Sequence, residues 1–287
     1  MTTEKFAEFL AVHLWAVLFV IALGMLLVAG LLWHALQRYG GRFVTLGQGV
    51  IDRIRPHARR LPIPGAVHSI WQIASGLGIQ VLASVAIAVA ACVGFVEIAD
   101  DIGVDDDLGR FDVALSAALS QHASDRQLRI FAAVTDLGDK DFLIPLAAVI
   151  AAFMLFRRRW FLAAAWLVAT AGGALSNVGL KAIFERSRPE HLHGFASASG
   201  WSFPSGHSSG SFIVYGLLAY LIVIHSTPRW HWPVAAAAMM LIVCVGFSRV
   251  VLQVHYFSDV LGGYAVGAAW VAAWIAGLEV FRRRNIS

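Results

Sequence analysis

The feature that most constrains this chain is a series of long segments without a charged residue. A transmembrane helix needs roughly 20 mostly apolar residues, and several segments approach or exceed that length. Only 14% of the 287 residues are charged, whereas soluble domains contain about 25%. We therefore predict an all-α protein, a polytopic membrane helix bundle with seven membrane helices. The uncharged runs cover residues 10–33, 71–96, 142–156, 160–180, 208–224, 230–247 and 260–278.

The chain divides at about residue 70, where the sequence Leu-Pro-Ile-Pro-Gly at 61–65 marks a boundary. Residues 1–70 are predicted to form an N-terminal transmembrane helix and an Arg-rich cytoplasmic segment. Residues 71–287 are predicted to form a core of six helices, and the helix of the short run 142–156 should begin about a turn earlier. Within the core, Gly263 with Gly267 and the pair Gly172–Gly173 have the small-residue pattern of closely packed membrane helices.

The distribution of charge predicts the orientation of the helices. The formal net charge is +4, and the excess of arginine lies in connections between runs, so it indicates membrane topology and not nucleic-acid binding. The connection 97–141 holds eleven acidic residues against four basic ones and is expected on the outer side. We expect the N-terminus outside and the C-terminus inside, in a bacterial inner (cytoplasmic) membrane. The arginines expected on the cytoplasmic side are Arg38, Arg42, Arg53, Arg55, Arg59, Arg60, Arg157, Arg158, Arg159, Arg229, Arg282, Arg283 and Arg284.

The outer connection has apolar residues at helical spacing between positions 111 and 134. This pattern predicts one or two short helices on the outer membrane surface. The acidic run Asp105, Asp106 and Asp107 is interpreted as solvated charge and not as a metal site. Cys92 and Cys244 lie in apolar runs and are interpreted as small core residues without a disulfide.

Three clusters of polar residues stand out because ionisable groups near a membrane span are costly, at roughly 2.5 to 3.5 kcal/mol each near a helix centre. In the first, Lys181 and Arg188 are seven residues apart, so a helix would place them on one face. Two cations on one face could bind an anion that has several oxygens. The alternative is that they belong to a girdle of basic residues that contacts lipid head groups at the membrane interface. Glu185 and Arg186 fall on other faces and are assigned to that girdle.

The second cluster is Pro204-Ser205-Gly206-His207, directly before an apolar run. Proline suits a first helical position, and the free N–H groups of a helix start can bind an anion. The alternative is an ordinary capped helix start with an interfacial histidine.

The third cluster contains Arg249, His255 and Asp259. If the segment is helical, Asp259 lies one turn after His255 and can hold its imidazole. A carboxylate on one ring nitrogen fixes the tautomer and leaves the other nitrogen free to attack. The alternatives are a buried structural His–Asp pair and a metal site, for which a third ligand is missing.

In this order and at these spacings, the three clusters resemble the signature of the type 2 phosphatidic acid phosphatase family. Its superfamily also includes bacterial acid phosphatases and vanadium haloperoxidases. The resemblance covers roughly residues 71–287, and every signature position matches. It implies a six-helix bundle with its site at one membrane face.

The resemblance implies a role for each residue, without a metal or other cofactor. His255 would be the nucleophile and form a phosphohistidine, Asp259 would orient it, and His207 would act as general acid and then base. Phosphoryl transfer needs positioning and charge neutralisation above all. The phosphate-binding groups would be Lys181, Arg188, Ser205, Gly206 and Arg249.

The expected substrate is a lipid phosphate that enters sideways from the bilayer. Candidates are undecaprenyl diphosphate, phosphatidic acid, phosphatidylglycerol phosphate and lipid A phosphates, and the loop 190–203 either selects the head group or only connects helices. Three other functions remain open: a lipid phosphotransferase with the same phosphohistidine, a haloperoxidase, and a non-catalytic scaffold or transporter. The sequence leaves the oligomeric state open.

Overall fold

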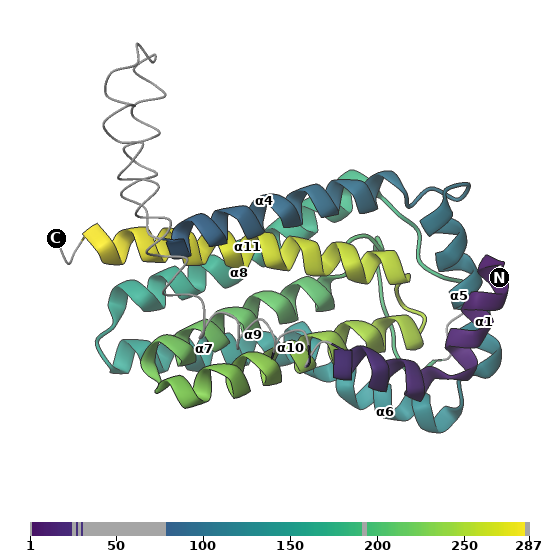
Figure 1. Ribbon diagram of the computed structural model, residues 1–287, viewed down its shortest axis with the longest axis horizontal. Coiled ribbons are helices and arrows are strands. Elements are labelled where there is room, and N and C mark those ends of the chain that lie inside the picture. The colour runs from purple at the N-terminus through teal and green to yellow at the C-terminus, as the bar shows by residue number, and fades with distance from the viewer. Residues whose placement is uncertain (1, 25–26, 28–29, 31–78, 191–193, 285–287) are drawn as a thin grey trace, which may run out of the picture.

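The computed structural model describes residues 2–24, 27, 30, 79–190 and 194–284. All regular elements in these residues are helical, which confirms the predicted all-α class. Figure 1 shows long helices lying side by side, with the shorter α1, α5 and α6 gathered at one end of the bundle.

Six long helices of the described residues lie together in one bundle. All except α7 are long and apolar enough to cross a membrane, and α7 has 17 residues. Helix α7 begins two residues before its uncharged run and contains Pro145. The six helices are α4 (Ile79–Asp100), α7 (Lys140–Phe156), α8 (Trp160–Phe184), α9 (Gly206–His225), α10 (Pro228–Val251) and α11 (Phe257–Arg284).

The N-terminal segment differs from the single straight helix predicted over 10–33. Helix α1 (Thr3–Val12) ends at His13, and the chain turns by 90° into a second helix, Leu14–Gly24. The cause is packing, because α1 buries Ala7 and Ala11 and lies against α5. The prediction of one uninterrupted helix is therefore wrong at the start of this run, where the chain bends at His13. The remainder of that run, the Arg-rich segment and the boundary near residue 70 fall outside the described residues.

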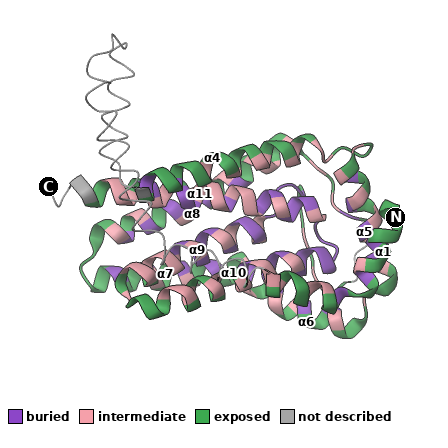
Figure 2. Cartoon of the chain, in the orientation of Figure 1, coloured by how far each residue is buried: buried purple, intermediate pink, exposed green. Residues whose placement is uncertain are grey.

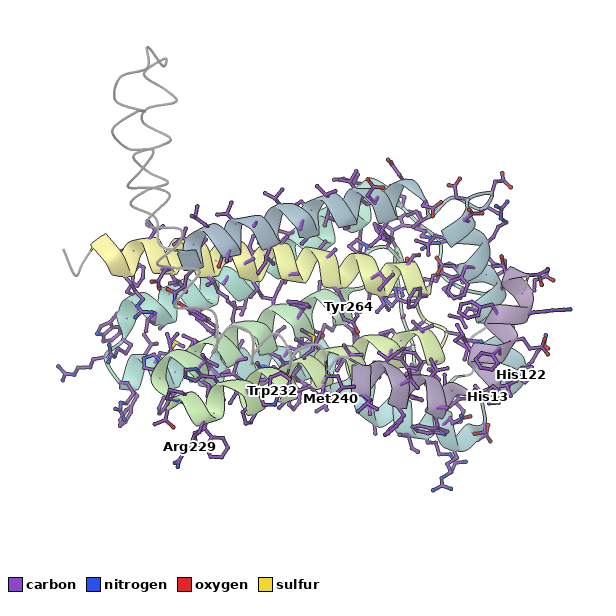
Figure 3. All side chains as sticks on the ribbon, viewed as in Figure 1. His13, His122, Arg229, Trp232, Met240 and Tyr264 are labelled. Atoms are coloured by element: carbon purple, nitrogen blue, oxygen red, sulfur yellow. The ribbon has the colours of Figure 1, made fainter. Side chains whose placement is uncertain are left out.

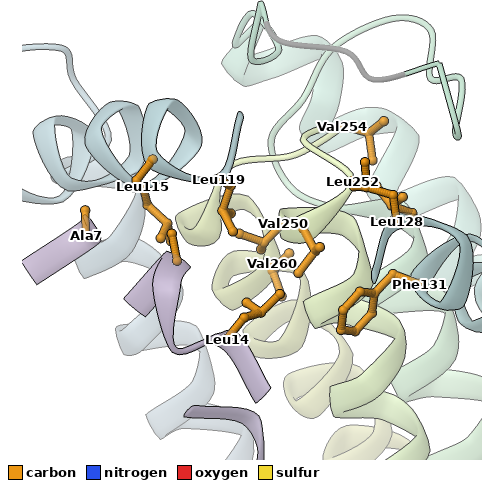
Figure 4. Packing of buried hydrophobic residues seen from close by; sticks show 13 residues of the cluster. Ala7, Leu14, Leu115, Leu119, Leu128, Phe131, Val250, Leu252, Val254 and Val260 are labelled. Carbon is orange, nitrogen blue, oxygen red and sulfur yellow. The ribbon is translucent and has the colours of Figure 1, made fainter. Parts of the chain in front are cut away.

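The outer connection forms two helices, α5 (Asp107–His122) and α6 (Asp125–Thr135), followed by the short turn η1 (Asp136–Gly138). This outcome confirms the prediction of short helices between the spans. Figure 4 shows how their apolar residues, including Leu115 and Leu128, pack with Val250 of α10 and with Val254 in the turn that follows it. The layer therefore supports the connection between α10 and α11 from outside the bundle.

Glycines permit close contact between α8, α9 and α11, as predicted. A side chain at Gly263 would meet the Ser205 carbonyl oxygen at 2.7 Å, and one at Gly173 would meet Ile213 at 2.4 Å. Figure 2 shows that buried residues concentrate on α9, α10 and α11, whereas α4 is largely exposed. Cys92 lies exposed on α4 and not in the core, because α4 contacts the bundle mainly through α11.

The two ends of the bundle differ in charge: acidic residues are most numerous at one end, and the other end carries mainly arginines. The acidic outer connection and the three polar clusters lie at one end, which we call the site end. The arginines at 157–159, Arg229 and Arg282 lie at the other, the Arg end, as the helix directions require. Figure 3 shows Arg229 and His122 at these two opposite ends. The predicted grouping of the arginines is thus confirmed for the described residues.

Candidate active site

His255 lies in the tight turn between α10 and α11. The carbonyl of Arg249 accepts from the N–H groups of both Val254 and His255, and Gln253 has φ 53°. The segment is therefore not helical at His255, which was the condition for the predicted pairing, since α11 begins only at Phe257. The predicted pairing nevertheless forms, because Asp259 in the first turn of α11 places Oδ2 3.2 Å from His255 Nδ1. Both side chains are buried.

The neighbours of His255 assign a role to each ring nitrogen. Nδ1 faces Asp259 Oδ2, which also accepts from Ser202 Oγ and from the Tyr256 N–H at 2.8 Å. Nε2 faces Arg188 Nη1 at 3.1 Å. Because Arg188 can only donate, Nε2 must present its lone pair and Nδ1 must carry the proton. Burial lowers the pKa of His255 to about 4 despite the opposing effect of Asp259, so the ring is neutral at pH 7.

Arg186 does not belong to an interfacial girdle, and that prediction is wrong. Its guanidinium reaches inward and bonds Asp259 Oδ1 and Asp112 Oδ2, both at 2.8 Å. It also lies over the Tyr256 ring, 4.5 Å from the centroid. Burial opposes its charge, but Asp259 and Asp112 raise the pKa of Arg186 above its ordinary value. Arg186 thus joins the outer helix α5 to the carboxylate behind His255.

Asp112 is the second residue of this network that sequence analysis missed. It is buried on α5 and accepts from the backbone N–H of Ser258 at 3.0 Å and from the Ser258 hydroxyl. The sequence did contain a signal. Asp112 is three residues before Leu115 and seven before Leu119, so an acidic residue lies on the apolar face of the predicted helix.

Lys181 and Arg188 converge without sharing a helix face. Helix α8 ends at Phe184, and Glu185 adopts a left-handed conformation with φ 44°, so Arg188 lies beyond the helix. Both side chains donate to the carbonyl of Trp201, Arg188 at 3.1 Å. Arg188 also bonds the carbonyls of Ser199 and Gly200. The loop after Arg188 therefore brings the two cations together.

A buried aromatic ring anchors this loop to the bundle. Phe203 is fully buried and stacks on Phe95 of α4, with ring centroids 5.4 Å apart, and meets Phe184 of α8 edge-on at 5.0 Å. One residue earlier, the Ser202 N–H donates to the Arg186 carbonyl at 2.8 Å. These contacts fix the position of Ser202, whose hydroxyl bonds Asp259.

Arg249 completes the cation cluster from the end of α10. It is 3% exposed and donates from Nη1 to Thr135 Oγ1 at 2.7 Å, while its buried Nε has no hydrogen-bond partner among the described residues. Arg249 lies within electrostatic range of both Arg188 and Lys181. Three cations held this close repel one another, and a bound anion would relieve that repulsion.

Ser205 has a structural position at the start of α9. It is the N-cap residue, so Pro204 precedes the cap and does not occupy the predicted first helical position. Ser205 Oγ accepts from the Ser208 N–H at 3.4 Å and bonds Ser208 Oγ at 3.0 Å. Its own N–H donates to the Asp259 carbonyl at 2.9 Å, which ties α9 to α11. Gly206 begins the helix beside His207.

His207 pairs with an acidic residue that sequence analysis left unassigned. Its Nε2 lies 3.3 Å from Oδ2 of Asp139, the N-cap residue of α7. Arg249, His255 and Arg188 all lie near enough for their charges to act on His207. The packing is tight, since a side chain at Gly138 would meet the His207 ring at 3.3 Å. No local spacing could reveal this pair, because Asp139 is 68 residues away in sequence.

Among the described residues, no group of three His, Cys, Asp or Glu side chains is placed to hold a metal ion. In the acidic run, Asp107 forms an exposed ion pair with Arg110. All eight predicted site residues lie at the site end, and the two imidazoles and the three cations lie around one region. These features define a membrane helix bundle that gathers two imidazoles and three cations at one end.

Comparison with known proteins gives the family. Residues 160–283 match the model of the PAP2 superfamily. Phosphatidylglycerophosphatase B of Bacillus subtilis (strain 168) is 37% identical over 140 residues, which cover 48% of this chain and 68% of that protein. The chain belongs to the PAP2 superfamily.

A solved structure and a second relative are also similar. The crystal structure of the first transmembrane PAP2 type phosphatidylglycerolphosphate phosphatase from Bacillus subtilis matches with a TM-score of 0.61 and 31% identity. The match covers 70% of this chain and 98% of that chain. The lipid A 1-phosphatase of Rhizobium johnstonii is 36% identical over 118 residues, 38% of this chain and 44% of that protein.

Proposed function

We propose that this protein is a membrane lipid phosphatase that works through a phosphohistidine at His255. The observation that carries the proposal is the orientation of His255. Nδ1 is held by Asp259, and the lone pair of Nε2 points at Arg188 in the cation cluster. A phosphoryl group bound by those cations would lie directly in front of the nucleophilic nitrogen.

In the first step, Nε2 attacks phosphorus and the bond from phosphorus to the lipid oxygen breaks. Arg188 Nη1, which now faces Nε2, donates instead to a phosphoryl oxygen, together with Lys181, Arg249 and the Gly206 N–H. Protonated His207 gives its proton to the leaving oxygen, and the lipid alcohol departs. Asp259 stabilises the positive charge that His255 acquires.

In the second step, His207 is neutral and acts as the base. It takes a proton from water, the water oxygen attacks phosphorus, and the bond from phosphorus to Nε2 breaks. The products are inorganic phosphate and His255 in its starting form. Three fixed cations neutralise the phosphoryl charge in both steps, so the mechanism predicts full activity in the presence of a chelator.

Two residues act through others and are proposed as positioning residues. Asp139 holds the ring of His207 through Nε2 and favours its protonated form by its charge. Arg186 holds Asp259 Oδ1, which leaves Oδ2 for His255. Ser205 keeps its predicted part in phosphate binding, because its Oγ accepts from Ser208 in both of its bonds and can still donate its hydrogen to a phosphoryl oxygen.

Phosphatidylglycerol phosphate is the first substrate to test. The support is the Bacillus subtilis phosphatase, of which this chain covers 98% in structure, while the match to the lipid A 1-phosphatase spans less than half of that protein. The site lies at the ends of the helices, beside exposed Trp201, where a lipid can approach from the bilayer. By the charge distribution, this end faces the outer, periplasmic side.

The test is phosphate release by the purified protein with phosphatidylglycerol phosphate, phosphatidic acid, undecaprenyl diphosphate and lipid A, each with EDTA. We expect fastest release from phosphatidylglycerol phosphate and none with His255→Ala. Release that requires an alcohol acceptor would indicate a phosphotransferase. No release from any of these lipids, or unchanged release by His255→Ala, would refute the proposal.

A further inference from the structure

A cavity at the Arg end, far from the candidate active site, combines cations with apolar walls. Its volume is about 520 Å³, and it lies where α8 begins and α9 and α11 end. We propose that this cavity binds the head group of an anionic phospholipid from the leaflet at that end of the bundle.

The cations come from two separate parts of the chain. Arg158 and Arg159 belong to the short turn between α7 and α8, and Arg282 belongs to the last turn of α11. The turn is tight, because Arg158 has φ 57° and the N–H of Arg159 donates to the Met154 carbonyl at 2.8 Å. Consecutive arginines are thereby directed to the rim of one cavity.

Little negative charge opposes these arginines. Arg282 forms an ion pair with Glu279 at 3.3 Å, and its side chain remains 51% exposed. Arg158 and Arg159 have no ion pair with a described residue. Among the described residues, the lining contains His225 but no acidic residue. The cavity therefore complements a ligand that carries at least one negative charge, and guanidinium groups suit phosphate oxygens in particular.

The walls favour an amphiphile over a free phosphate ion. Phe161 and Phe281 stack with ring centroids 3.9 Å apart and form one apolar wall between α8 and α11. Leu162, Tyr220 and Leu278 line both this cavity and a narrow crevice of about 20 Å³ between the same three helices. Apolar surface thus lies directly beside the cations, as an amphiphile requires and a free phosphate ion does not.

Positive residues at a cytoplasmic helix end are expected from topology alone, so the test must separate a specific site from general charge. The chain provides a matched control. Arg157 and Arg229 lie at the same end and are exposed, but neither lines the cavity. Arg159→Ala/Arg282→Ala and Arg157→Ala/Arg229→Ala each remove two charges, and only the first pair removes them from the cavity.

The measurement is native mass spectrometry of the full-length protein, with the His255→Ala substitution to prevent turnover. The probes are dioleoyl phosphatidylglycerol, dioleoyl phosphatidylcholine and glycerol phosphate. We expect phosphatidylglycerol to bind best and the cavity variant to bind it about tenfold more weakly, as the loss of charged hydrogen bonds predicts. The control variant should bind as the parent does, and so should Arg188→Ala at the site end.

A second variant protects the test against misfolding. Leu278→Trp keeps every arginine but fills the cavity, and it should also weaken retention of phosphatidylglycerol. Equal binding of phosphatidylcholine would overturn the proposal, and so would equally strong binding of glycerol phosphate that the cavity variant weakens and Arg188→Ala leaves unchanged. Equal weakening by the cavity and control variants would do the same, because it would show diffuse charge. None of these outcomes depends on whether the protein hydrolyses a lipid phosphate.

Discussion

The two ends of the bundle use arginine in opposite ways. At the site end, the Arg186 side chain is 13% exposed and bridges two carboxylates that are fully buried. At the Arg end, Arg282 is half exposed and forms its ion pair with Glu279, three residues away on its own helix. Buried ion pairs between distant segments fix geometry, because removing one partner leaves a buried charge uncompensated. Exposed pairs contribute little.

This difference explains how a chain with so few charged residues can hold its polar side chains in a fixed arrangement. The carboxylate behind His255 is fixed by Ser202 in the loop before α9 and by Arg186 in the segment after α8, and Arg186 is held in turn by Asp112 of α5. By contrast, the arginines of the other end surround open space that a ligand can occupy. The following substitutions test this contrast, from the largest expected effect to the smallest.

His207→Ala should reduce the rate of phosphomonoester hydrolysis by about 100- to 10,000-fold, the usual contribution of a general acid. An alkoxide is a poor leaving group and needs the proton. When a lipid diphosphate is attacked at its terminal phosphorus, the leaving group is the lipid monophosphate, which needs the proton less. The loss should therefore be smaller for undecaprenyl diphosphate. The check is kcat for both substrates with the same preparation, and equal losses would argue against the role of His207 as acid.

Arg186→Ala should lower both activity and stability. Two buried carboxylates lose their cation, which costs about 3–5 kcal/mol of unfolding free energy, and displacement of Asp259 should reduce kcat about 100-fold. The matched control is Arg110→Ala, which breaks an exposed pair in the same outer layer and should change stability by about 1 kcal/mol or less. Thermal unfolding and kcat are measured on both variants, and they show whether Arg186 stabilises the site more than an exposed ion pair does. If Arg186→Ala behaved like Arg110→Ala, the bridging role would be wrong.

Asp139→Asn should reduce kcat about tenfold, as expected for the loss of one favourable charge interaction. The loss should depend on the leaving group, because Asp139 acts through His207. An activated aryl phosphate should be hydrolysed almost normally, and a lipid monoester should be hydrolysed slowly. The control is Asp141→Asn, at an exposed acidic position in the first turn of α7. A loss independent of the leaving group would indicate a purely structural part for Asp139.

The protonation of His255 should have little effect on the reaction rate between pH 5 and pH 7. Only the neutral ring attacks, and the pKa of His255 is lowered to about 4. At pH 5 protonation should remove only about a tenth of the activity, and below pH 4 the rate should fall about tenfold per pH unit. Log kcat/KM between pH 3.5 and 7 tests this, with a diphosphate substrate as a check on substrate ionisation. A limb near pH 6.5 assigned to His255 would contradict the buried, neutral ring.

Local patterns in the sequence predicted most of the bundle. Uncharged runs located α7 to α11 to within a few residues, because a lipid-facing helix must be apolar over its whole length. The same logic failed for residues 10–24, where contact of Ala7 and Ala11 with the outer layer bends the chain at His13. Apolar composition alone does not distinguish a straight span from a bent one.

The site was predictable where its partners are close in sequence and not where they are distant. His255 and Asp259 are four residues apart and pair even though the turn is not helical. Arg186 pairs with Asp112 across 74 residues, and His207 with Asp139 across 68. Only the fold brings such residues together, and for that reason the predicted surface role of Arg186 was wrong.

The most direct measurement is identification of the residue that carries phosphate during turnover. His207→Ala protein is mixed with radiolabelled diphosphate lipid, because without its base the second step should be slow and the intermediate should accumulate. After alkaline quenching, peptide mass spectrometry should find acid-labile phosphate on residue 255, and none in the double variant with His255→Ala. Phosphate on any other residue, or turnover without a covalent intermediate, would contradict the account.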